Sequence, residues 1–490
     1  MPIDPEKSKD KYELVVGLEV HAQLSTFSKA FSSDSAAFGG DPNTHVSVVS
    51  LGHPGTLPRI NKKMVEYAVK MGLACNSAIS LHNTFARKNY FYADLPKGYQ
   101  VTQDQFPICI GGAVTVRLSD GSQKDIAIHH IHMEEDAGKS MHDQHHSDSY
   151  IDLNRAGVPL IEIVSEPDIR SSEEAGQYLT EIRKLLRYLD ICDGNMEEGS
   201  MRCDANISVR LKGETIFGNR CEVKNMNSIR NVQRAIEHEF ERQVQILERG
   251  GRIEQNTLNF DADTGETSVL RSKEMANDYR YFPEPDLQPL YLNDAYVEQI
   301  RASLPALPKR LFEKYTVDLG LPAYDASVIT ADRDTAVYFE ELISHTQNFK
   351  AAANWLMGAV KSYLNENGVQ ITDFCIKPAN LAGIISLVDS GKVNNTIAAQ
   401  RLFPAMIADP GKGAEQLANE LNLMIGLGGD DVQRYISEAI AKYPDKVIEY
   451  RKGKKGVIGL FMGEIMKRSQ GRIDPQTTNQ LLIKELESNR

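Results

Sequence analysis

Two polar side chains near the start of the chain are spaced to bind one ion. Through residues 12–24, apolar residues alternate with a polar series of Gly17, Glu19, His21 and Gln23. Because side chains of a strand point alternately to its two faces, Glu19 and His21 should lie on the same face, about 7 Å apart. A carboxylate and an imidazole there could reach one divalent ion. An ordinary solvent-facing strand has the same alternation, so both interpretations stay open.

Two further predicted strands, residues 201–211 and 215–224, carry a denser set of charges. Their polar positions alternate with apolar ones: Arg202, Asp204, Asn206, Ser208, Arg210, Arg220, Glu222 and Lys224. In a hairpin, the apolar faces coincide only when paired residue numbers sum to an even value. One such register sets Asp204 opposite Glu222. Facing carboxylates repel each other unless a cation lies between them.

This predicted hairpin face has the chemistry of a metal and phosphate site. Hard oxygen ligands suit Mg²⁺ or Mn²⁺, often together with substrate phosphates. Arginine and lysine side chains on the same face could hold those phosphates. A solvated sheet face is an equally good interpretation of the pattern alone.

An acidic run follows a predicted strand over residues 125–133. The run ends in Gly-Lys-Ser, but Met133 occupies a position where a Walker phosphate loop requires glycine. Glu134 or Glu135 could still supply a metal ligand. Strict alternation places Glu134 on the side of His132, whereas a bulge would place Glu135 there.

Two other segments could contact nucleic acid or nucleotide. Residues 87–100 mix cations with aromatic side chains, which could bind phosphate and stack a base, or simply dock on the sheet. Residues 446–472 hold eight Lys or Arg against two Asp or Glu. Since the whole chain has a net charge of −12, bulk nucleic-acid binding is excluded, and this basic run is the best local candidate.

The elements that must position these residues indicate an α+β fold with a largely antiparallel sheet. Strands are predicted over residues 12–24, 114–118, 125–133, 158–165, 201–211 and 215–224. Ser171 and Glu174 predict the start of one helix, and Asn227 or Ser228 starts another that ends at Gly250. Strands and helices do not alternate regularly, which excludes a simple βαβ repeat.

The 490 residues are too many for one hydrophobic core, so several domains are expected. Proline-rich segments and a change from strand-like to helical patterns predict the domain boundaries. The predicted domains are 1–295, 296–408 and 409–490, and the last two are helical. The six cysteines show no Cys-x-x-Cys spacing, which favours a reducing, cytoplasmic location. No apolar run is long enough to span a membrane, and the first residues lack a secretory signal.

Ten segments of the chain together resemble the GatB/GatE family of tRNA amidotransferase subunits. They are GLEVHAQL (17–24), FARKNYFYADLPKGYQ (85–100), HMEEDAGKS (132–140), DLNRAGVPLIEIVSEPDIRS (152–171), MEEGSMRCDANIS (196–208), EVKNMNS (222–228), DYRYFPEPDLQPL (278–290), LPAYDASV (321–328), NWLMGAV (354–360) and GLFMGEIMK (459–467). The segments preserve the family order and cover essentially the whole chain. The histidine-rich loop at residues 142–146 departs from the family pattern and is interpreted as solvated.

The resemblance implies a glutamine-synthetase-like cradle domain, a helical domain and a YqeY-like tail that binds tRNA. It also implies a reaction. The side-chain carboxylate of misacylated Glu-tRNA(Gln) or Asp-tRNA(Asn) is phosphorylated by ATP with Mg²⁺, and ammonia then displaces the phosphate. The ammonia would come from the GatA glutaminase, with GatC as the third partner. The alternatives are a tRNA-binding scaffold without chemistry and a free-standing ligase that uses ammonia on a small acid.

Motif matching also transfers residue roles from the family to this chain. The resemblance implies metal ligation by Glu19, His21, Glu135, Asp204 and Glu222. It implies catalytic contacts with phosphate or the acyl carboxylate, and hence ATP binding, by Lys88, Arg202 and Lys224. For the acidic run, the family match favours Glu135, whereas simple alternation favours Glu134.

Overall fold

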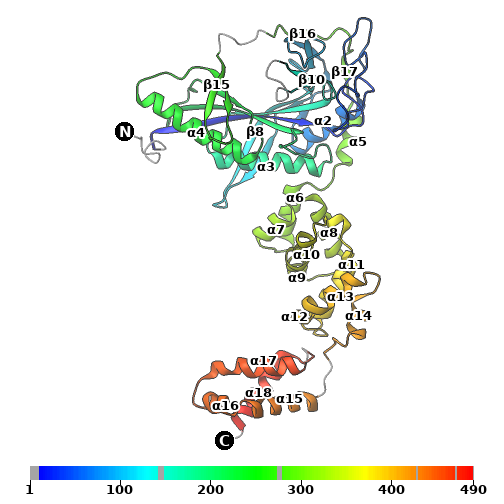
Figure 1. Cartoon of the computed structure of the whole chain (residues 1–490), viewed down its shortest axis with the longest axis vertical. Coiled ribbons are helices and arrows are strands. Elements are labelled where there is room, and N and C mark those ends of the chain that lie inside the picture. The colour runs from blue at the N-terminus through cyan, green and yellow to red at the C-terminus, as the bar shows by residue number, and fades with distance from the viewer. Residues whose placement is uncertain (1–9, 142–147, 273–278, 426–428, 470–471, 489–490) are drawn as a thin grey trace. The chain divides into compact units, whose positions relative to one another are not determined.

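The computed structural model describes residues 10–141, 148–272, 279–425, 429–469 and 472–488. The chain divides into two compact units, Met1–Pro308 and Lys309–Arg490, which are considered separately (Figure 1). The predicted histidine loop lies outside the described residues. Among the described residues, no helix is both long and apolar enough to cross a membrane. The three-domain division stays a prediction.

A mostly antiparallel sheet of thirteen strands dominates the first unit. Its main path runs through β15 (Thr267–Ser272), β14 (Asn256–Phe260), β13 (Cys221–Lys224), β12 (Met201–Leu211), β1 (Tyr12–Gln23), β11 (Pro159–Ser165), β8 (Gln123–Glu135), β5 (Tyr99–Thr102), β4 (Ala86–Asn89) and β16 (Phe282–Pro283). Three strands branch from it: β2 (Ala78–Ile79), β6 (Cys109–Ile110) and β7 (Ala113–Arg117). Two separate pairs are β9 (Lys139–Met141) with β10 (Tyr150–Asp152), and β3 (His82–Asn83) with β17 (Leu290–Tyr291).

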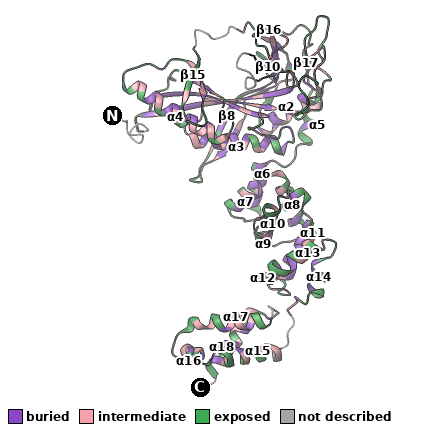
Figure 2. Ribbon diagram, viewed as in Figure 1, coloured by how far each residue is buried: buried purple, intermediate pink, exposed green. Residues whose placement is uncertain are grey.

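Helices cover one face of this sheet (Figure 1). They are α2 (Lys62–Ala74), α3 (Ser172–Tyr188), α4 (Ile229–Glu248) and α5 (Asp294–Ala302). The even-numbered side chains of β1 from Leu14 to Ala22 are buried in one core with residues of these helices. Figure 2 shows buried residues along the strands of the sheet. The odd-numbered side chains point to the opposite face, which these helices leave open. The predicted α+β class is therefore confirmed, and the alternation decides which residues are available for chemistry.

The predicted helix starts are also confirmed. Ser171 precedes α3, and its hydroxyl accepts a hydrogen bond from the Glu174 backbone N–H at 3.1 Å. Ser228 precedes α4 in the same way, accepting from Asn231 N–H at 3.1 Å. Each serine satisfies a backbone donor that the first helical turn leaves without a partner.

The predicted hairpin differs from the structure in length and in register. Strand β13 covers only Cys221–Lys224, and residues 212–220 form no strand, although Gly218 lies close to Val209 of β12. Asn206, not Asp204, lies opposite Glu222. The parity rule holds, since 206 and 222 sum to an even number, but the register is shifted by two residues. The predicted Asp204–Glu222 pairing is therefore wrong.

The second unit is entirely helical in its described residues. Its first part contains α6 (Pro308–Glu313), α7 (Ala323–Ile329), α8 (Arg333–Ser344), α9 (Phe349–Trp355), α10 (Lys361–Asn367), α11 (Pro378–Asp389), α12 (Asn395–Ile397), α13 (Phe403–Ala408) and α14 (Ala414–Glu420). Three π-helical segments, Lys314–Asp318, Leu356–Val360 and Ala398–Leu402, extend or join these helices.

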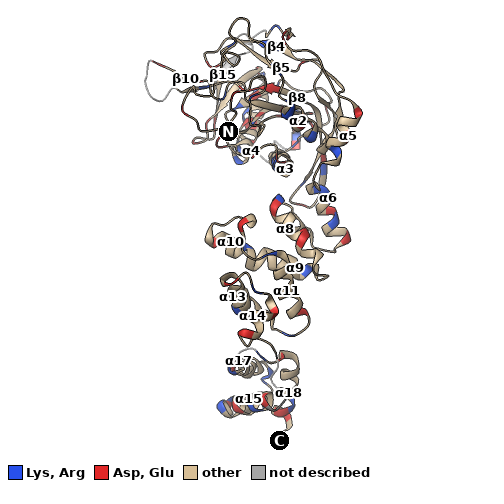
Figure 3. Ribbon diagram, turned by 90° about the vertical axis from the view of Figure 1, so that its right-hand side faces the viewer, with Lys and Arg blue, Asp and Glu red and all other residues tan. Residues whose placement is uncertain are grey.

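The C-terminal part has its own small core. It consists of α15 (Gly429–Lys442), α16 (Pro444–Arg451), α17 (Ile458–Arg468) and α18 (Pro475–Ser488). Phe461 and Ile465 of α17 are fully buried in this core, together with Ile436 and Leu482. Phe461 and Ile465 are four residues apart, a spacing that places both on the same face of the helix. Both basic and acidic residues lie along these helices (Figure 3).

Candidate functional site

The open sheet face forms the floor of a polar cleft of about 560 Å³. Strands β1, β8 and β12 each contribute to it, as do segments from the turn regions around them. The lining residues that carry charge are His21, Lys88, Glu134, Asp136, Arg202, Asp204 and Lys224. A cleft lined by so many ionisable groups of both signs suits a charged ligand better than an apolar one.

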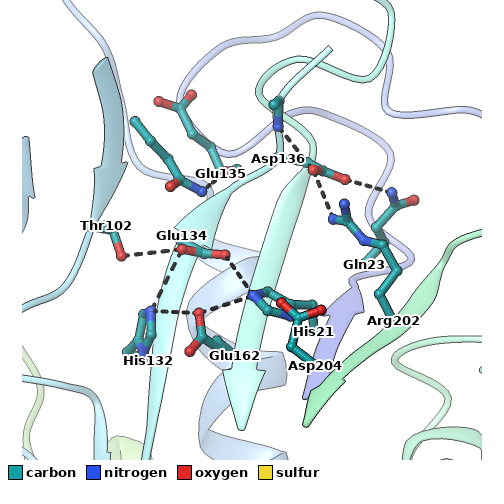
Figure 4. A network of polar contacts seen from close by, with 12 residues as sticks. His21, Gln23, Thr102, His132, Glu134, Glu135, Asp136, Glu162, Arg202 and Asp204 are labelled. Atoms are coloured by element: carbon teal, nitrogen blue, oxygen red, sulfur yellow. Dashed lines mark hydrogen bonds and ion pairs between the residues drawn. The ribbon is translucent and has the colours of Figure 1, made fainter. Parts of the chain in front are cut away.

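The first group of potential metal ligands centres on His21. Its Nε2 lies 3.0 Å from Glu162 Oε2 and 3.8 Å from Glu134 Oε1 (Figure 4). His21 and Glu162 are direct cross-strand partners in the β1–β11 pairing. His132 lies opposite Glu162 on β8 and contacts both carboxylates at 3.6 Å. Adjacent strands thus gather two carboxylates and two imidazoles in one place.

The second group centres on Glu19, two residues before His21 on the same strand. Glu19 lies opposite Asp204 in the β1–β12 pairing, and Glu222 on β13 completes the group. In each group, one oxygen or nitrogen from each of three side chains lies within 4.8 Å of the other two. The three acids come from three neighbouring strands, because β12 lies between β1 and β13.

Hydrogen bonds hold the second group in position. Asn206 Nδ2 donates to Glu19 Oε1 at 2.8 Å, and Thr257 Oγ1 donates to Glu222 Oε2 at 3.0 Å. The ammonium of Lys224 forms ion pairs with both Asp204 and Glu222, the latter at 2.8 Å. A positive charge therefore lies where facing carboxylates require one.

The pKa values of Glu19 and His21 are both shifted by the carboxylates that surround them. Burial and the neighbouring Glu162, Asp204 and Glu222 carboxylates raise the pKa of Glu19. Burial lowers the pKa of His21, but Glu162 and Glu134 outweigh that effect and raise it to about 9. Neighbouring carboxylates contribute to both shifts, and such an excess of negative charge favours a bound cation.

The donor chemistry of both groups fits a hard divalent cation. Carboxylate oxygens supply the second group completely, and the first adds an imidazole nitrogen. Such ligands suit Mg²⁺ or Mn²⁺, which also accept phosphate oxygens and water. Of the five predicted ligands, the structure brings Glu19, Asp204 and Glu222 together and places His21 in the neighbouring group.

Glu135 does not join either group, and its predicted position among the ligands needs correction. Its carboxylate forms an ion pair with Lys97 and accepts a hydrogen bond from the Val101 N–H at 2.9 Å. Figure 4 shows it directed away from His21. The β8 strand continues without a bulge through Glu135, so alternation sends Glu134 to the cleft and Glu135 to the other side.

The three predicted cations all line the cleft. Arg202 Nη2 donates to Asp136 Oδ1 at 2.8 Å, and Gln23 donates to the other oxygen of that carboxylate at 2.7 Å. The ammonium of Lys88 lies 4.9 Å from the centre of the Tyr279 ring. Burial lowers the pKa of Lys88, but Glu134 and Glu162 raise it overall, so this lysine is held in its charged form.

Residues 87–100 have a mixed role. Lys88 and Tyr90 line the cleft, whereas Arg87 binds Glu284 at 2.8 Å and stacks 4.2 Å from the Tyr99 ring centre. Some residues of the segment therefore line the cleft while others dock onto the sheet, so each of the two open interpretations describes part of it.

Sequence reasoning missed Glu162 and left His132 without a role. Glu162 is a single acid within an apolar run, Pro159–Ser165, and this break in the run was the available signal. A carboxylate flanked by buried isoleucines requires a partner. The partners are His21 and His132, on the two strands that flank β11.

Two family models match the chain. The GatB/GatE catalytic domain matches residues 14–298, which contain both ligand groups, and a GatB domain (GatB_Yqey) matches residues 337–486. The all-helical second unit agrees with the second match.

Several relatives, each named as the B component of an aspartyl/glutamyl-tRNA(Asn/Gln) amidotransferase, align with almost the whole chain. A protein from Chlorobium chlorochromatii is 48% identical over 97% of this chain and 99% of its own length. One from Caldicellulosiruptor bescii is 47% identical, and one from Pseudomonas syringae pv. syringae is 46% identical. Both cover 97% of this chain, and the alignments span 99% and 100% of the relatives. The resemblance inferred from the sequence is thereby confirmed, and the chain belongs to the GatB/GatE family.

Proposed function

We propose that this chain is the component of a tRNA amidotransferase that activates and amidates the misacylated amino acid. The substrates are Glu-tRNA(Gln), Asp-tRNA(Asn) or both, with ATP as the phosphoryl donor. The observation that carries the proposal is the pair of adjacent ligand groups on one sheet face, with Lys88, Arg202 and Lys224 around the same cleft. The family membership and the amidotransferase relatives support it.

A side-chain carboxylate is a poor electrophile, and its phosphorylation supplies a leaving group for ammonia. Phosphoryl transfer depends mainly on positioning and on neutralising negative charge. Bound Mg²⁺ would neutralise phosphate charge, held by Glu19, Asp204 and Glu222 on one side and His21, Glu134 and Glu162 on the other. Glu134 replaces Glu135 in this assignment.

The cations of this chain have separate roles in the proposal. Lys88 and Arg202 bind the phosphate oxygens or the acyl carboxylate, because both line the cleft with their charge preserved. Lys224 holds Asp204 and Glu222 together, and its ammonium would be available to phosphate oxygens if a metal ion took over that role. Asp136 orients Arg202 through their 2.8 Å contact.

The remaining parts of the chain and its partners bring tRNA and ammonia to the site. The basic C-terminal helices contact the tRNA backbone, although Lys455 and Arg468 also form surface ion pairs with Glu487 and Glu464 at 2.9 and 2.8 Å. Exposed pairs of this kind contribute little and can exchange for phosphates. GatA supplies ammonia from glutamine and GatC completes the assembly, in the cytoplasm where tRNA is charged.

The test is co-expression with GatA and GatC, purification of the complex, and assay on both mischarged tRNAs with ATP and Mg²⁺. Formation of Gln-tRNA(Gln) or Asn-tRNA(Asn) is expected, and it should require all three proteins. A complex that forms but leaves both mischarged tRNAs unchanged would overturn the proposal.

A further inference from the structure

Three histidines of β8 form a row in which each imidazole contacts the next. His129 Nδ1 lies 2.7 Å from His130 Nδ1, and His130 Nε2 lies 3.0 Å from His132 Nδ1. The ring centres are 4.9 Å apart for the first pair and 5.1 Å apart for the second. His129 is exposed, whereas His132 is buried and contacts Glu134 and Glu162 of the first ligand group. The row therefore runs from the surface to the wall of the candidate site.

The contact between His129 and His130 depends on an irregularity in the sheet. Neighbouring residues of a regular strand point to opposite faces, so their side chains do not meet. In the pairing of β11 with β8 the register shifts, because Val164 lies opposite His130 but Ser165 lies opposite Ile128. His129 is therefore the extra residue of a β-bulge. Bulges change the direction of side chains and are frequent beside active sites.

The buried residues of β8 show the same irregularity. Before the bulge, Ile126 and Ile128 belong to the core, and after it Ile131 and Met133 do. The core positions thus change from even to odd numbers, and the two histidines between them are both left off the core side. From Ile131 to Glu135 the pairing is regular, so the bulge does not disturb the alternation there. Its effect is to bring two adjacent imidazoles together.

Two imidazole nitrogens at this separation suit a transition ion. Zn²⁺ binds imidazole nitrogen at about 2.0–2.1 Å, so two nitrogens of one tetrahedral site lie about 3.3 Å apart. The Nδ1 atoms of His129 and His130 need to separate only slightly to reach that value. Burial and the neighbouring His132 and His129 rings lower the pKa of His130 to about 4, so its ring is neutral and keeps a lone pair.

We propose that His129 and His130 bind a divalent transition ion such as Zn²⁺ through their Nδ1 atoms, at a site separate from both oxygen-rich ligand groups. Imidazole suits Zn²⁺, Ni²⁺ and Cu²⁺, whereas Mg²⁺ prefers oxygen ligands. Water completes the coordination, since His129 is exposed. With Nδ1 on the ion, His130 donates its Nε2–H to His132 Nδ1. His132 then directs its Nε2–H toward Glu134 and Glu162, so the ion fixes the tautomer along the whole row.

The test is calorimetric titration of the full-length chain with Zn²⁺ in excess Mg²⁺, which competes for the oxygen ligands. We expect His129→Gln and His130→Gln each to lose the same Zn²⁺-binding event, because each removes one of two protein ligands. His345→Gln should keep that event and is the matched control, since His345 is an exposed histidine of the second unit. Urea unfolding of the metal-free variants, with an unchanged midpoint, shows that they are folded.

A combined variant of His142→Gln, His145→Gln and His146→Gln tests the other histidine-rich segment of the sequence. It should also keep the Zn²⁺-binding event. Loss of the event in this variant, with the event intact in His129→Gln, would overturn the proposal. A wild-type chain that binds no Zn²⁺, or whose Zn²⁺ binding disappears in excess Mg²⁺, would overturn it as well. Since neither ATP nor tRNA takes part in this experiment, its result is independent of the reaction proposed above.

Discussion

Glu19 lies directly opposite Asp204 across the pairing of β1 with β12. Two carboxylates at paired positions of a sheet destabilise it, unless a cation offsets their repulsion. In this structure the ammonium of Lys224 meets Asp204, and it also contacts Glu222 at 2.8 Å. The site is therefore held together by a positive charge that a divalent ion could replace.

Replacing Lys224 by methionine should expose this repulsion. We expect the metal-free protein to lose about 1–2 kcal/mol of unfolding free energy, less than for a fully buried pair because the lysine is 29% exposed. Mn²⁺ should bind more tightly, since its competitor is gone. Urea unfolding and Mn²⁺ titration would measure both effects, with Lys62→Met, at an exposed residue of α2, as the control. Unchanged stability together with weaker Mn²⁺ binding would contradict the idea.

Replacing Asp204 by asparagine should separate catalysis from tRNA binding. The change preserves shape but removes one charged ligand, and we expect ATP-dependent activation to fall at least about 100-fold. Affinity for tRNA should stay the same, because the basic helices are untouched. The measurement is amidation of mischarged tRNA alongside filter binding. Full amidation by this variant would favour a scaffold without chemistry.

The His21 group should bind metal in a pH-dependent way. With a pKa of about 9, His21 is protonated at neutral pH and must lose its proton to ligate a metal. Apparent Mn²⁺ affinity should therefore rise by up to about ten-fold per pH unit from 7 to 9. Calorimetry in two buffers of different ionisation enthalpy would count the released protons. His21→Gln should abolish that release.

The raised pKa of His21 has the opposite effect on the metal-free protein: its stability should fall as pH rises. Since the folded pKa of His21 is above its ordinary value of 6.5, the stabilisation is complete below about pH 6.5 and is lost as pH rises through 9. A metal-free protein that gained stability over this range relative to His21→Gln would contradict the assignment.

Glu134 and Glu135 should respond differently to the same substitution. Glu134→Gln should weaken Mn²⁺ binding, because this side chain belongs to the His21 group. Glu135→Gln should leave Mn²⁺ binding unchanged but cost about 3–5 kcal/mol of stability, since it breaks a buried pair with Lys97. Mn²⁺ titration and urea unfolding of both variants give the comparison. The reverse pattern would restore Glu135 as the ligand.

The basic C-terminal helices should bind tRNA through charge. Changing Lys452, Lys454 and Lys455 together to alanine should weaken tRNA binding and reduce its salt dependence, because each lost phosphate contact lowers the slope by about one. A Lys→Arg triple variant keeps the charge and serves as the control. Equal binding by the alanine variant and wild type at every salt concentration would remove this role.

Local structure was predictable from the sequence where it depends on a single strand or helix. The strand over Met201–Leu211 has the expected bounds, Ser171 caps its helix as predicted, and Ser228 caps the next helix as one of the two predicted candidates. Alternation along β1 correctly placed Glu19 and His21 on one face. These features depend on backbone geometry within a single segment, and that geometry is visible in the sequence.

Features that depend on pairing between distant segments were not predictable. Nothing in residues 12–24 indicates that β1 lies between β11 and β12, so the meeting of His21 with Glu162 could not be inferred. The β12–β13 register also escaped prediction, because residues 212–220 form an irregular connection and not a tight turn that would fix the register. Alternation along the strand placed Glu134 on the side of His132, where the cleft lies, whereas the family match favoured Glu135 as the ligand.

Both ligand groups draw on one uninterrupted strand, and this limits how the site can vary. The interval between Glu19 and His21 is a property of the peptide backbone, about 7 Å, and no side-chain substitution alters it. Inserting a single residue between them would send one of the two into the hydrophobic core beneath the sheet. Individual donors can therefore be exchanged, while the distance between the two centres cannot be tuned gradually.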